Sequence, residues 1–185
     1  MAMIEPAGGP AIHSLDHFCL TVPNLDEARS FYTEFGLEVR DGANGLELYT
    51  FGNPHRWGVL RQGARKKLEY IAFGVFKGDL ERFRQKLQGL GVEIIDTPPV
   101  GEDGGVWFRN LDGMPMQVIE ADKCSPDTKA QFLTRSVGPG ECAAVPRSKA
   151  PRVHPRRLSH FLIFTSDVMR DIDFYEKTLG LKLSD

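Results

Sequence analysis

The chain carries one sequence pattern twice, and this internal repeat constrains its fold more than any other feature. The two copies begin near residues 14 and 157 and are related by a shift of 143 positions (160 − 17). The shift pairs Leu15 with Leu158, His17 with His160, Phe18 with Phe161, Phe31 with Phe174 and Tyr32 with Tyr175. One extra residue then brings Gly36-Leu37 onto Gly180-Leu181. Because 185 residues are too few for two units of 143, we expect one complete copy and the start of a second.

The first copy begins with a strand whose two faces differ. Apolar and mixed residues alternate along it, with Phe18, Leu20 and Val22 on one face and His17, Cys19 and Thr21 on the other. A helix is expected next, because Asn24 is a good N-cap and apolar residues recur at helical spacing as far as Gly36. Residues 37–40, 46–51 and 57–60 alternate between turn-forming segments and are typical of strands. The unit is therefore β-α-β-β-β.

A weaker version of this unit follows along the chain. We expect a strand over 68–75, a helix from the N-cap Asp79 to Gly91, and strands over 92–95, 105–109 and 114–121. Residues 14–121 are thus predicted to form one α+β module of two βαβββ halves. Each half turns one sheet face to its own helix, and the two uncovered faces are expected to line an open barrel or cleft. His17 lies on that uncovered face.

Residues 122–156 read as a linker, because prolines and glycines interrupt them, with one short helix expected near 128–133. Residues 157–185 read as the start of a second module. They contain a predicted strand over 158–164, a helix capped by Ser166 or Asp167 that ends near Leu179, and the first residues of another strand. Such a start cannot cover both of its faces, so we expect a truncated product.

Composition excludes several classes of protein. Lys and Arg total 23 against 25 Asp and Glu, so the sequence predicts no nucleic-acid partner. Neither a membrane-spanning run nor a signal peptide is visible, which predicts no membrane association. Cys19, Cys124 and Cys142 have no metal-binding spacing and leave an odd thiol, which suits a reducing, cytoplasmic location.

Tandem βαβββ halves with a His on the first strand, a helix ending in Phe-Tyr and a following Gly-Leu resemble the vicinal oxygen chelate superfamily. This superfamily has the glyoxalase-like fold and includes glyoxalase I, bleomycin-resistance proteins and the type I extradiol dioxygenases. A second module after a long connector looks most like the extradiol enzymes, which act on catechols. The resemblance covers residues 14–121 well and 157–185 as a fragment.

The resemblance implies a metal held by a His on the first strand, a His on the first strand of the other half, and a Glu on the last strand. His17 matches the first position, whereas Tyr70 and Gln117 occupy the other two. Since neither is a ready ligand at neutral pH, the metal site of the first module is expected to be degenerate. In the dioxygenases the C-terminal module carries the iron, so His160 would be the first ligand, with its partners beyond Asp185.

The resemblance therefore implies an intact enzyme that opens a small aromatic diol of the catechol type with O₂, in aromatic hydrocarbon catabolism. Its cofactor would be Fe(II), with Mn(II) as the alternative, and this chain by itself would bind no metal, contain no catalytic residue and be inactive. One alternative is a metal-free protein that binds small aromatics, like the bleomycin-resistance proteins. Its cleft would be lined by Trp57, Tyr70, Trp107 and Phe108. Another is a glyoxalase-like lyase or isomerase, which needs a carboxylate that Gln117 does not offer.

Other residues receive simpler interpretations. Glu69, Glu120 and His55 are candidates for a rearranged site, but alternation places Glu69 on the face opposite Tyr70, and His55 follows a turn. The Phe-Tyr pairs on the two helices are expected to be core, and Cys19 is expected to be buried and inert. Because the segment 157–185 would expose an apolar face and open strand edges, we expect a homo-oligomer, either domain-swapped or side by side.

Overall fold

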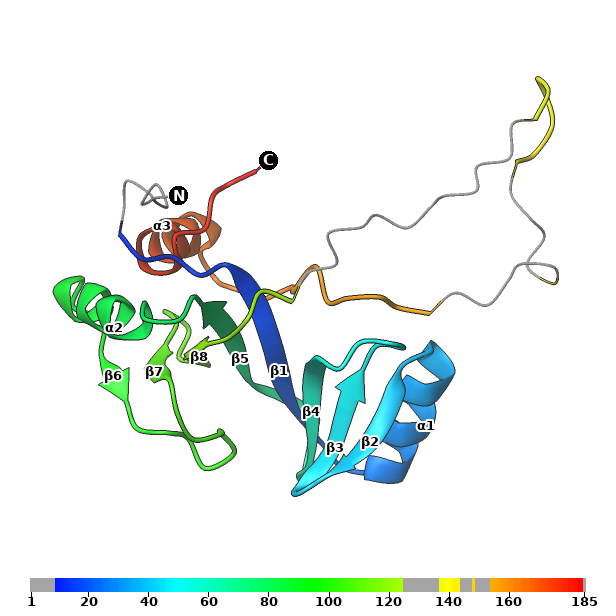
Figure 1. Ribbon diagram of the computed structural model, residues 1–185, viewed down its shortest axis with the longest axis horizontal. Coiled ribbons are helices and arrows are strands. Elements are labelled where there is room, and N and C mark those ends of the chain that lie inside the picture. The colour runs from blue at the N-terminus through cyan, green and yellow to red at the C-terminus, as the bar shows by residue number, and fades with distance from the viewer. Residues whose placement is uncertain (1–8, 125–136, 144–147, 149–153, 185) are drawn as a thin grey trace.

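The computed structural model describes residues 9–124, 137–143, 148 and 154–184 (Figure 1). The first half of the module contains β1 (Ser14–Val22), α1 (Leu25–Phe35), β2 (Glu38–Gly42), β3 (Gly45–Tyr49) and β4 (Arg56–Gln62). The second half contains β5 (Lys67–Val75), α2 (Leu80–Gly89), β6 (Ile94–Ile95), β7 (Val106–Arg109) and β8 (Pro115–Glu120). The predicted βαβββ unit therefore occurs twice, as expected, although β6 is shorter than the strand predicted over 92–95.

The strands form one mixed sheet in the order β2-β3-β4-β1-β5-β8-β7-β6. Within the halves β1 pairs with β4, and β5 with β8, in parallel, while β1 and β5 pair antiparallel and join the halves. A shift of 53 residues (67 − 14) superimposes β1 on β5 from end to end. The two halves are thus related by an approximate twofold axis through the β1–β5 ladder, with α1 and α2 at opposite ends of the sheet (Figure 1).

Two β-bulges interrupt the β1–β5 ladder. Leu15 pairs with Phe73 and His17 with Ala72, so Asp16 is an extra residue in β1. Cys19 pairs with Tyr70 and Leu20 with Leu68, so Glu69 is an extra residue in β5. The two bulges are again 53 residues apart (69 − 16). Because an extra residue reverses the alternation of side chains, Leu15 faces the helices whereas His17 faces the other side of the sheet.

The two sheet faces carry different cores. On the helix face, α1 packs partly buried Leu25, Ala28 and Tyr32 against β3 and β4, and α2 buries Phe83 and Leu87 completely. On the opposite side, which we call the open face, Cys19, Val59, Tyr70, Ala72 and Trp107 form a small second core. The expectation that the Phe-Tyr pair of α1 is core was wrong for Phe31, whose ring is 60% exposed. The helix therefore covers the sheet with the narrower stripe formed by Leu25, Ala28 and Tyr32.

The helix ends follow the sequence closely. The Asn24 side chain accepts hydrogen bonds from the backbone N–H groups of Asp26 and Glu27, and Gly36 ends α1 with φ 101°. The second copy behaves in the same way. Asp167 accepts from the N–H of Arg170 at the start of α3 (Val168–Leu179), and Gly180 ends that helix with φ 73°. The predicted helix of the second copy is therefore confirmed, including its cap and its stop.

The strand predicted over 158–164 was wrong, as was a strand after Gly180 among the described residues up to 184. A strand exists only through hydrogen bonds to a neighbour, and none of the eight strands pairs with this segment. The segment still alternates: Phe161 and Ile163 are half-buried, whereas His160, Leu162 and Phe164 are exposed. The short helix expected near 128–133 lies outside the described residues.

Instead of building its own sheet, the C-terminal segment covers the second half of the module. Leu179 is completely buried in the core formed by Ile71, Phe73, Phe108 and Met116, and Phe161 and Tyr175 pack against it. The N–H of Ile12 also donates to the carbonyl of Leu179 at 3.0 Å. Figure 1 shows α3 close to α2 as a result.

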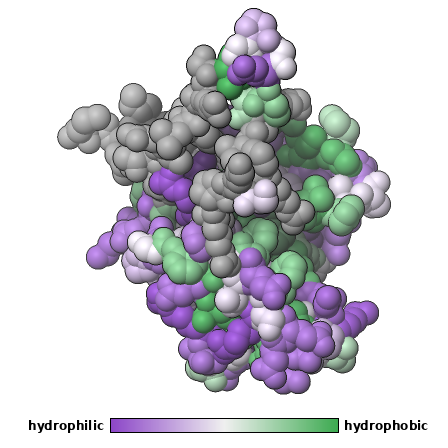
Figure 2. All heavy atoms as spheres, turned by 90° about the vertical axis from the view of Figure 1, so that its right-hand side faces the viewer, coloured by the Kyte–Doolittle hydropathy of each residue, from purple (hydrophilic) through white to green (hydrophobic). Residues whose placement is uncertain are grey.

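The surface carries both hydrophilic and hydrophobic areas. In Figure 2 hydrophilic residues dominate the lower part of the visible face, and hydrophobic residues gather along one upper edge. Exposed apolar side chains of the C-terminal segment include Leu162, Phe164, Val168 and Met169. Within the described ranges, none of the helices combines the length and apolar character needed to cross a bilayer.

Replacing Leu179 with alanine tests whether α3 belongs to the core of the module. Because the side chain is completely buried, Leu179→Ala should lower the free energy of unfolding by about 2–5 kcal/mol. Met169→Ala is the matched control on the same helix, since Met169 is 72% exposed and should change stability by less than about 0.5 kcal/mol. Urea denaturation followed by circular dichroism measures both, and equal effects would show that α3 is not part of the core.

Candidate functional site

His17 is held by two neighbours on the open face. Its side chain is almost completely buried, its Nδ1 lies 2.6 Å from the Asp16 carboxylate, and its Nε2 lies 3.3 Å from the Tyr70 hydroxyl. With the proton on Nδ1 donated to Asp16, Nε2 accepts the hydrogen bond from Tyr70. The two bulges produce this arrangement. The bulge at Asp16 turns His17 to the open face, and the bulge at Glu69 does the same for Tyr70, so the two rings meet there.

The other two positions of the metal trio implied by the resemblance also lie on this face. Tyr70 is completely buried, and burial raises the pKa of its phenol well above the ordinary value, so the group stays protonated. Gln117 pairs with Ala72 in the β5–β8 ladder, beside the strand that carries His17. The fold therefore places all three predicted positions on the same face of adjacent strands.

These residues do not fit a bound Fe(II). Both nitrogens of His17 are already engaged, Tyr70 offers a neutral phenol, and Gln117 turns its amide NH₂ to backbone carbonyls. A 2-His-1-carboxylate site needs two free imidazole nitrogens and an anionic oxygen. We therefore assign no metal chemistry to His17, Tyr70 and Gln117.

Gln117 has a different task, which is to hold a loop. Its Nε2 donates to the carbonyl of Glu102 at 3.2 Å and to the carbonyl of Gly104 at 3.0 Å. These carbonyls belong to the β6–β7 loop, residues 96–105, which bends over the open face. A glutamate at this position could not donate either bond when ionised. The amide is thus suited to fixing the loop, and a carboxylate is not.

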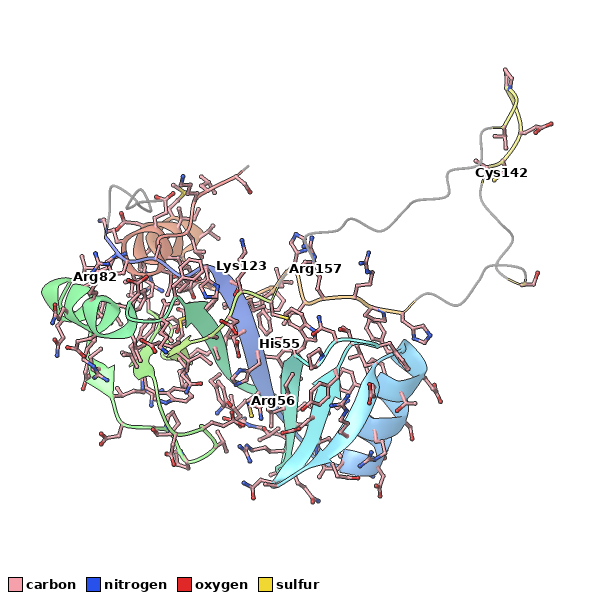
Figure 3. The ribbon with its side chains drawn as sticks, viewed as in Figure 1. His55, Arg56, Arg82, Lys123, Cys142 and Arg157 are labelled. Carbon is pink, nitrogen blue, oxygen red and sulfur yellow. The ribbon has the colours of Figure 1, made fainter. Side chains whose placement is uncertain are left out.

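The loop delivers Glu102 into a cluster of charges that the sequence analysis missed. Arg56 donates to both Glu102 oxygens, with Nη1 2.9 Å from Oε1, and also to Glu47 at 3.1 Å. His17 Nε2 and Arg61 Nη2 each lie 3.8 Å from the Glu102 carboxylate. Figure 3 shows Arg56 and His55 between the two halves of the sheet.

The carboxylates of Glu102 in the loop and Glu47 keep the Arg56 side chain on β4 charged. Burial alone would lower the pKa of Arg56, but its hydrogen bonds to Glu102 and Glu47 outweigh burial and raise it, so the guanidinium stays charged. A clue was present in the sequence, since Glu102 stands between Gly101 and Gly104-Gly105 in a connection that is much longer than its counterpart in the first half. No periodicity marks such a residue.

The open cleft expected on this face is filled. Trp57, Tyr70 and Trp107 are almost completely buried there, and Tyr70 and Trp107 meet edge to face at 4.9 Å between ring centroids. Phe108 does not join them, because it points to the helix face and packs with Met116 under α2. The expectation that Phe108 lines the cleft was therefore wrong. A cavity of ≈120 Å³ lies between the β2–β3 turn and Arg56, Arg61 and Glu102, and none of the three buried aromatic residues of the open face lines it.

Simple alternation had predicted that Glu69 lies on the sheet face away from Tyr70, and this was wrong. Glu69 is the bulged residue of β5, and its carboxylate accepts a hydrogen bond at 2.8 Å from Thr21. Thr21 pairs with Arg61 in the β1–β4 ladder and so lies on the open face. Glu69 also pairs with Lys67 at 2.6 Å, which leaves it a local role in the ladder.

His55, Glu120 and Cys19 also have structural roles. The N–H of His55 donates to Asn53, which confirms the turn, and its Nε2 lies 2.8 Å from the carbonyl of Asp16. Glu120 accepts from the N–H of Gly78 at 2.7 Å. Cys19 is completely buried, as expected, and burial raises the pKa of its thiol to about 11.

His160 is exposed, and its Nδ1 lies 3.0 Å from the hydroxyl of Ser159. In the part of the chain that the structure describes, no three His, Cys, Asp or Glu side chains are grouped so that they could hold a metal ion. Metal binding by His160 in a longer protein therefore stays a prediction.

Replacing Gln117 by glutamate tests the loop contact. Gln117→Glu removes both donors and turns a carboxylate toward two carbonyls, so it should lower the free energy of unfolding by about 1–3 kcal/mol at pH 7. The loss should shrink toward about pH 4, where the protonated new carboxyl group can donate again. Gln88→Glu, on the exposed surface of α2, is the control. Denaturation midpoints at both pH values measure the effect, and a pH-independent loss would contradict it.

The thiols offer a second test. At pH 8 a thiol with a pKa of about 11 is almost entirely protonated, and Cys19 is also buried, whereas Cys142 is exposed. A disulfide reagent should therefore label Cys142 in the folded protein and reach Cys19 only after denaturation, at least about 100-fold more slowly under native conditions. Mass spectrometry of Cys142→Ala and Cys19→Ala variants distinguishes the sites. Native labelling of Cys19 at the rate of Cys142 would show that the open face is accessible.

Comparisons with known proteins agree with this fold. The family described as Glyoxalase/Bleomycin resistance protein/Dioxygenase superfamily matches residues 14–118. Metapyrocatechase 2 of Cupriavidus necator is 42% identical over 182 residues, which are 97% of this chain and 57% of that protein. The chain thus spans little more than half the length of this curated relative.

Solved structures share the fold at lower identity. A catechol 2,3-dioxygenase matches 94% of this chain and 56% of its own, with a TM-score of 0.64 and 20% identity. BphC, a halotolerant catechol dioxygenase, matches 92% of this chain and 55% of its own, with a TM-score of 0.63 and 17% identity. With the family match over 14–118, these findings show that the chain belongs to the glyoxalase, bleomycin-resistance protein and dioxygenase superfamily.

Proposed function

We propose that this chain is the N-terminal part of an extradiol dioxygenase that opens catechols with O₂. The observation that carries the proposal is the 42% identity to metapyrocatechase 2, which extends over 97% of the chain and so includes the segment after the linker. In this proposal residues 14–121 form the N-terminal module, 122–156 the linker, and 157–185 the start of the catalytic module.

The internal repeat supports a catalytic site in the second module. His160 repeats His17, and the capped helix after it repeats α1 as far as the glycine stop. In the first module the corresponding histidine is engaged by Asp16 and Tyr70, and Gln117 fixes a loop. In the proposed second module His160 is exposed, and its Nδ1 lies 3.0 Å from the Ser159 hydroxyl.

In the intact enzyme His160 would supply one imidazole ligand, and residues following this chain would supply another imidazole and a carboxylate. Fe(II) held in this way, with Mn(II) as the alternative, leaves positions open for a catecholate and O₂. Cleavage beside the diol follows from the extradiol class. A single imidazole cannot retain the metal against water, so this chain alone is expected to be inactive.

We also propose that the protein is cytoplasmic and forms a homo-oligomer. The buried thiol of Cys19 and the odd number of cysteines suit a reducing compartment. The exposed apolar residues of the C-terminal segment, such as Leu162 and Phe164, would need cover in an assembly or in a completed second module.

The test uses the full-length protein, in which the chain continues past Asp185, and compares two equivalent histidines. His160→Gln should lower iron content and catechol-dependent O₂ uptake by about 100-fold or more, because it removes a direct ligand. His17→Gln is the control and should retain iron, although it disturbs a buried hydrogen bond. Iron analysis, an oxygen electrode and the absorbance of the yellow ring-fission product report the outcome. Full iron and activity in His160→Gln would refute the proposal.

A further inference from the structure

The β6–β7 loop is where the module departs most from its internal symmetry. In the first half β2 and β3 meet through a tight turn, in which Gly42 pairs directly with Gly45. The equivalent strands of the second half, β6 and β7, are joined by residues 96–105. The longer connection does not extend into solvent, because it returns to the open face and places Glu102 against β4.

The loop is built for close contact with this face. Gly101 lies against the indole of Trp107, where an added Cβ would come within 2.9 Å of the ring and 3.0 Å of the Pro98 carbonyl. The N–H of Gly101 donates to that carbonyl at 2.7 Å. Together with the two bonds from Gln117, these contacts determine where the Glu102 carboxylate lies.

The side chains around Glu102 form a binding site for a carboxylate group. Arg56 donates to both oxygens in the forked geometry typical of arginine–carboxylate recognition. Arg61 Nη2 and His17 Nε2 each lie 3.8 Å from a Glu102 carboxylate oxygen. If Glu102 were withdrawn, Glu47 would still neutralise part of the charge on Arg56, but the cluster would keep an excess of positive charge. A carboxylate from another molecule would restore the balance.

The neighbouring side chains suit a ligand whose carboxylate is attached to an aromatic ring. Trp57, Tyr70 and Trp107 form the wall of the open face, and all three are almost completely buried. Three polar atoms on this face, Arg61 Nε, Trp107 Nε1 and Gln117 Oε1, are buried without a hydrogen-bond partner among the described residues. Buried unpaired donors and acceptors are costly, so they indicate a place where a partner is expected. A separate cavity of ≈120 Å³ lies between the β2–β3 turn and Arg56, Arg61 and Glu102, on the arginine side of that carboxylate.

We propose that the open face of the first module is a binding site for a small aromatic carboxylate, which Glu102 occupies from within. The ligand carboxylate would take the place of Glu102 between Arg56 and Arg61, and its ring would lie against Tyr70 and Trp107 once the loop moves aside. Glu102, which is held in the β6–β7 loop, thus competes with the ligand carboxylate for the two arginines. The proposal does not depend on the dioxygenase activity, because it concerns the module without a fitting metal site.

The experiment measures binding of benzoate to the purified chain and to Glu102→Ala by calorimetry and thermal shift. Removing the tethered carboxylate should make benzoate bind at least about tenfold more tightly than it binds the unaltered chain. Benzamide, which has the same shape without the charge, should bind Glu102→Ala at least about tenfold more weakly than benzoate does. Asp103→Ala, at an exposed neighbouring loop position, is the matched control and should bind like the unaltered chain.

Two further variants keep the test decisive. Glu102→Gln retains the shape of the side chain but not its charge, so it should also bind benzoate more tightly and replaces Glu102→Ala if that variant does not fold. Adding Arg61→Ala to either variant should weaken benzoate binding by about tenfold. The proposal is overturned if a folded Glu102 variant gains no affinity for benzoate. It is equally overturned if benzamide binds as well, or if Arg61→Ala has no effect.

Discussion

The antiparallel pairing of β1 with β5 is the constraint on which the rest of the module depends. It joins two βαβββ halves into one sheet, and its two bulges decide which side chains meet on the open face. Without the extra residue Asp16, the alternation set by Leu15 would turn His17 toward the helices. Because Glu69 repeats this bulge 53 residues later (69 − 16), Tyr70, which pairs with Cys19, is turned to the same face as His17 by the same geometry.

Hydrogen bonds stabilise the open face, where the sequence resemblance had implied a degenerate metal site. A phenol, an amide and a histidine are poor ligands together, yet each finds a neutral partner: His17 meets Tyr70, and Gln117 meets two loop carbonyls. The loop then fills the remaining space and contributes Glu102, which balances the charges of Arg56 and Arg61. Charge balance and close packing therefore stabilise the described residues of this face.

Most of the fold could be predicted from the sequence, because its signals are local. Asn24 and Gly36 mark the ends of α1, Asp167 and Gly180 mark those of α3, and alternation from His17 to Val22 assigned the faces of β1 correctly. The failures concern information that no local pattern contains. A bulge is a property of two paired strands, so Glu69 was misplaced, and a strand at 158–164 needs a neighbour that the described structure does not offer. Glu102 was missed because its role depends on a loop crossing to β4.

The docking of α3 changes what counts as a minimal folding unit. By sequence the first module stops near residue 121, but its apolar interior is sealed by Leu179 and by Phe161 and Tyr175, contributed from across the linker. Excising residues 14–121 would leave Ile71, Phe73 and Met116 with less cover than they have in the whole chain. The boundary that is drawn by homology is therefore not the boundary of the hydrophobic interior, and a nascent chain gains its full shielding only after the linker has been synthesised.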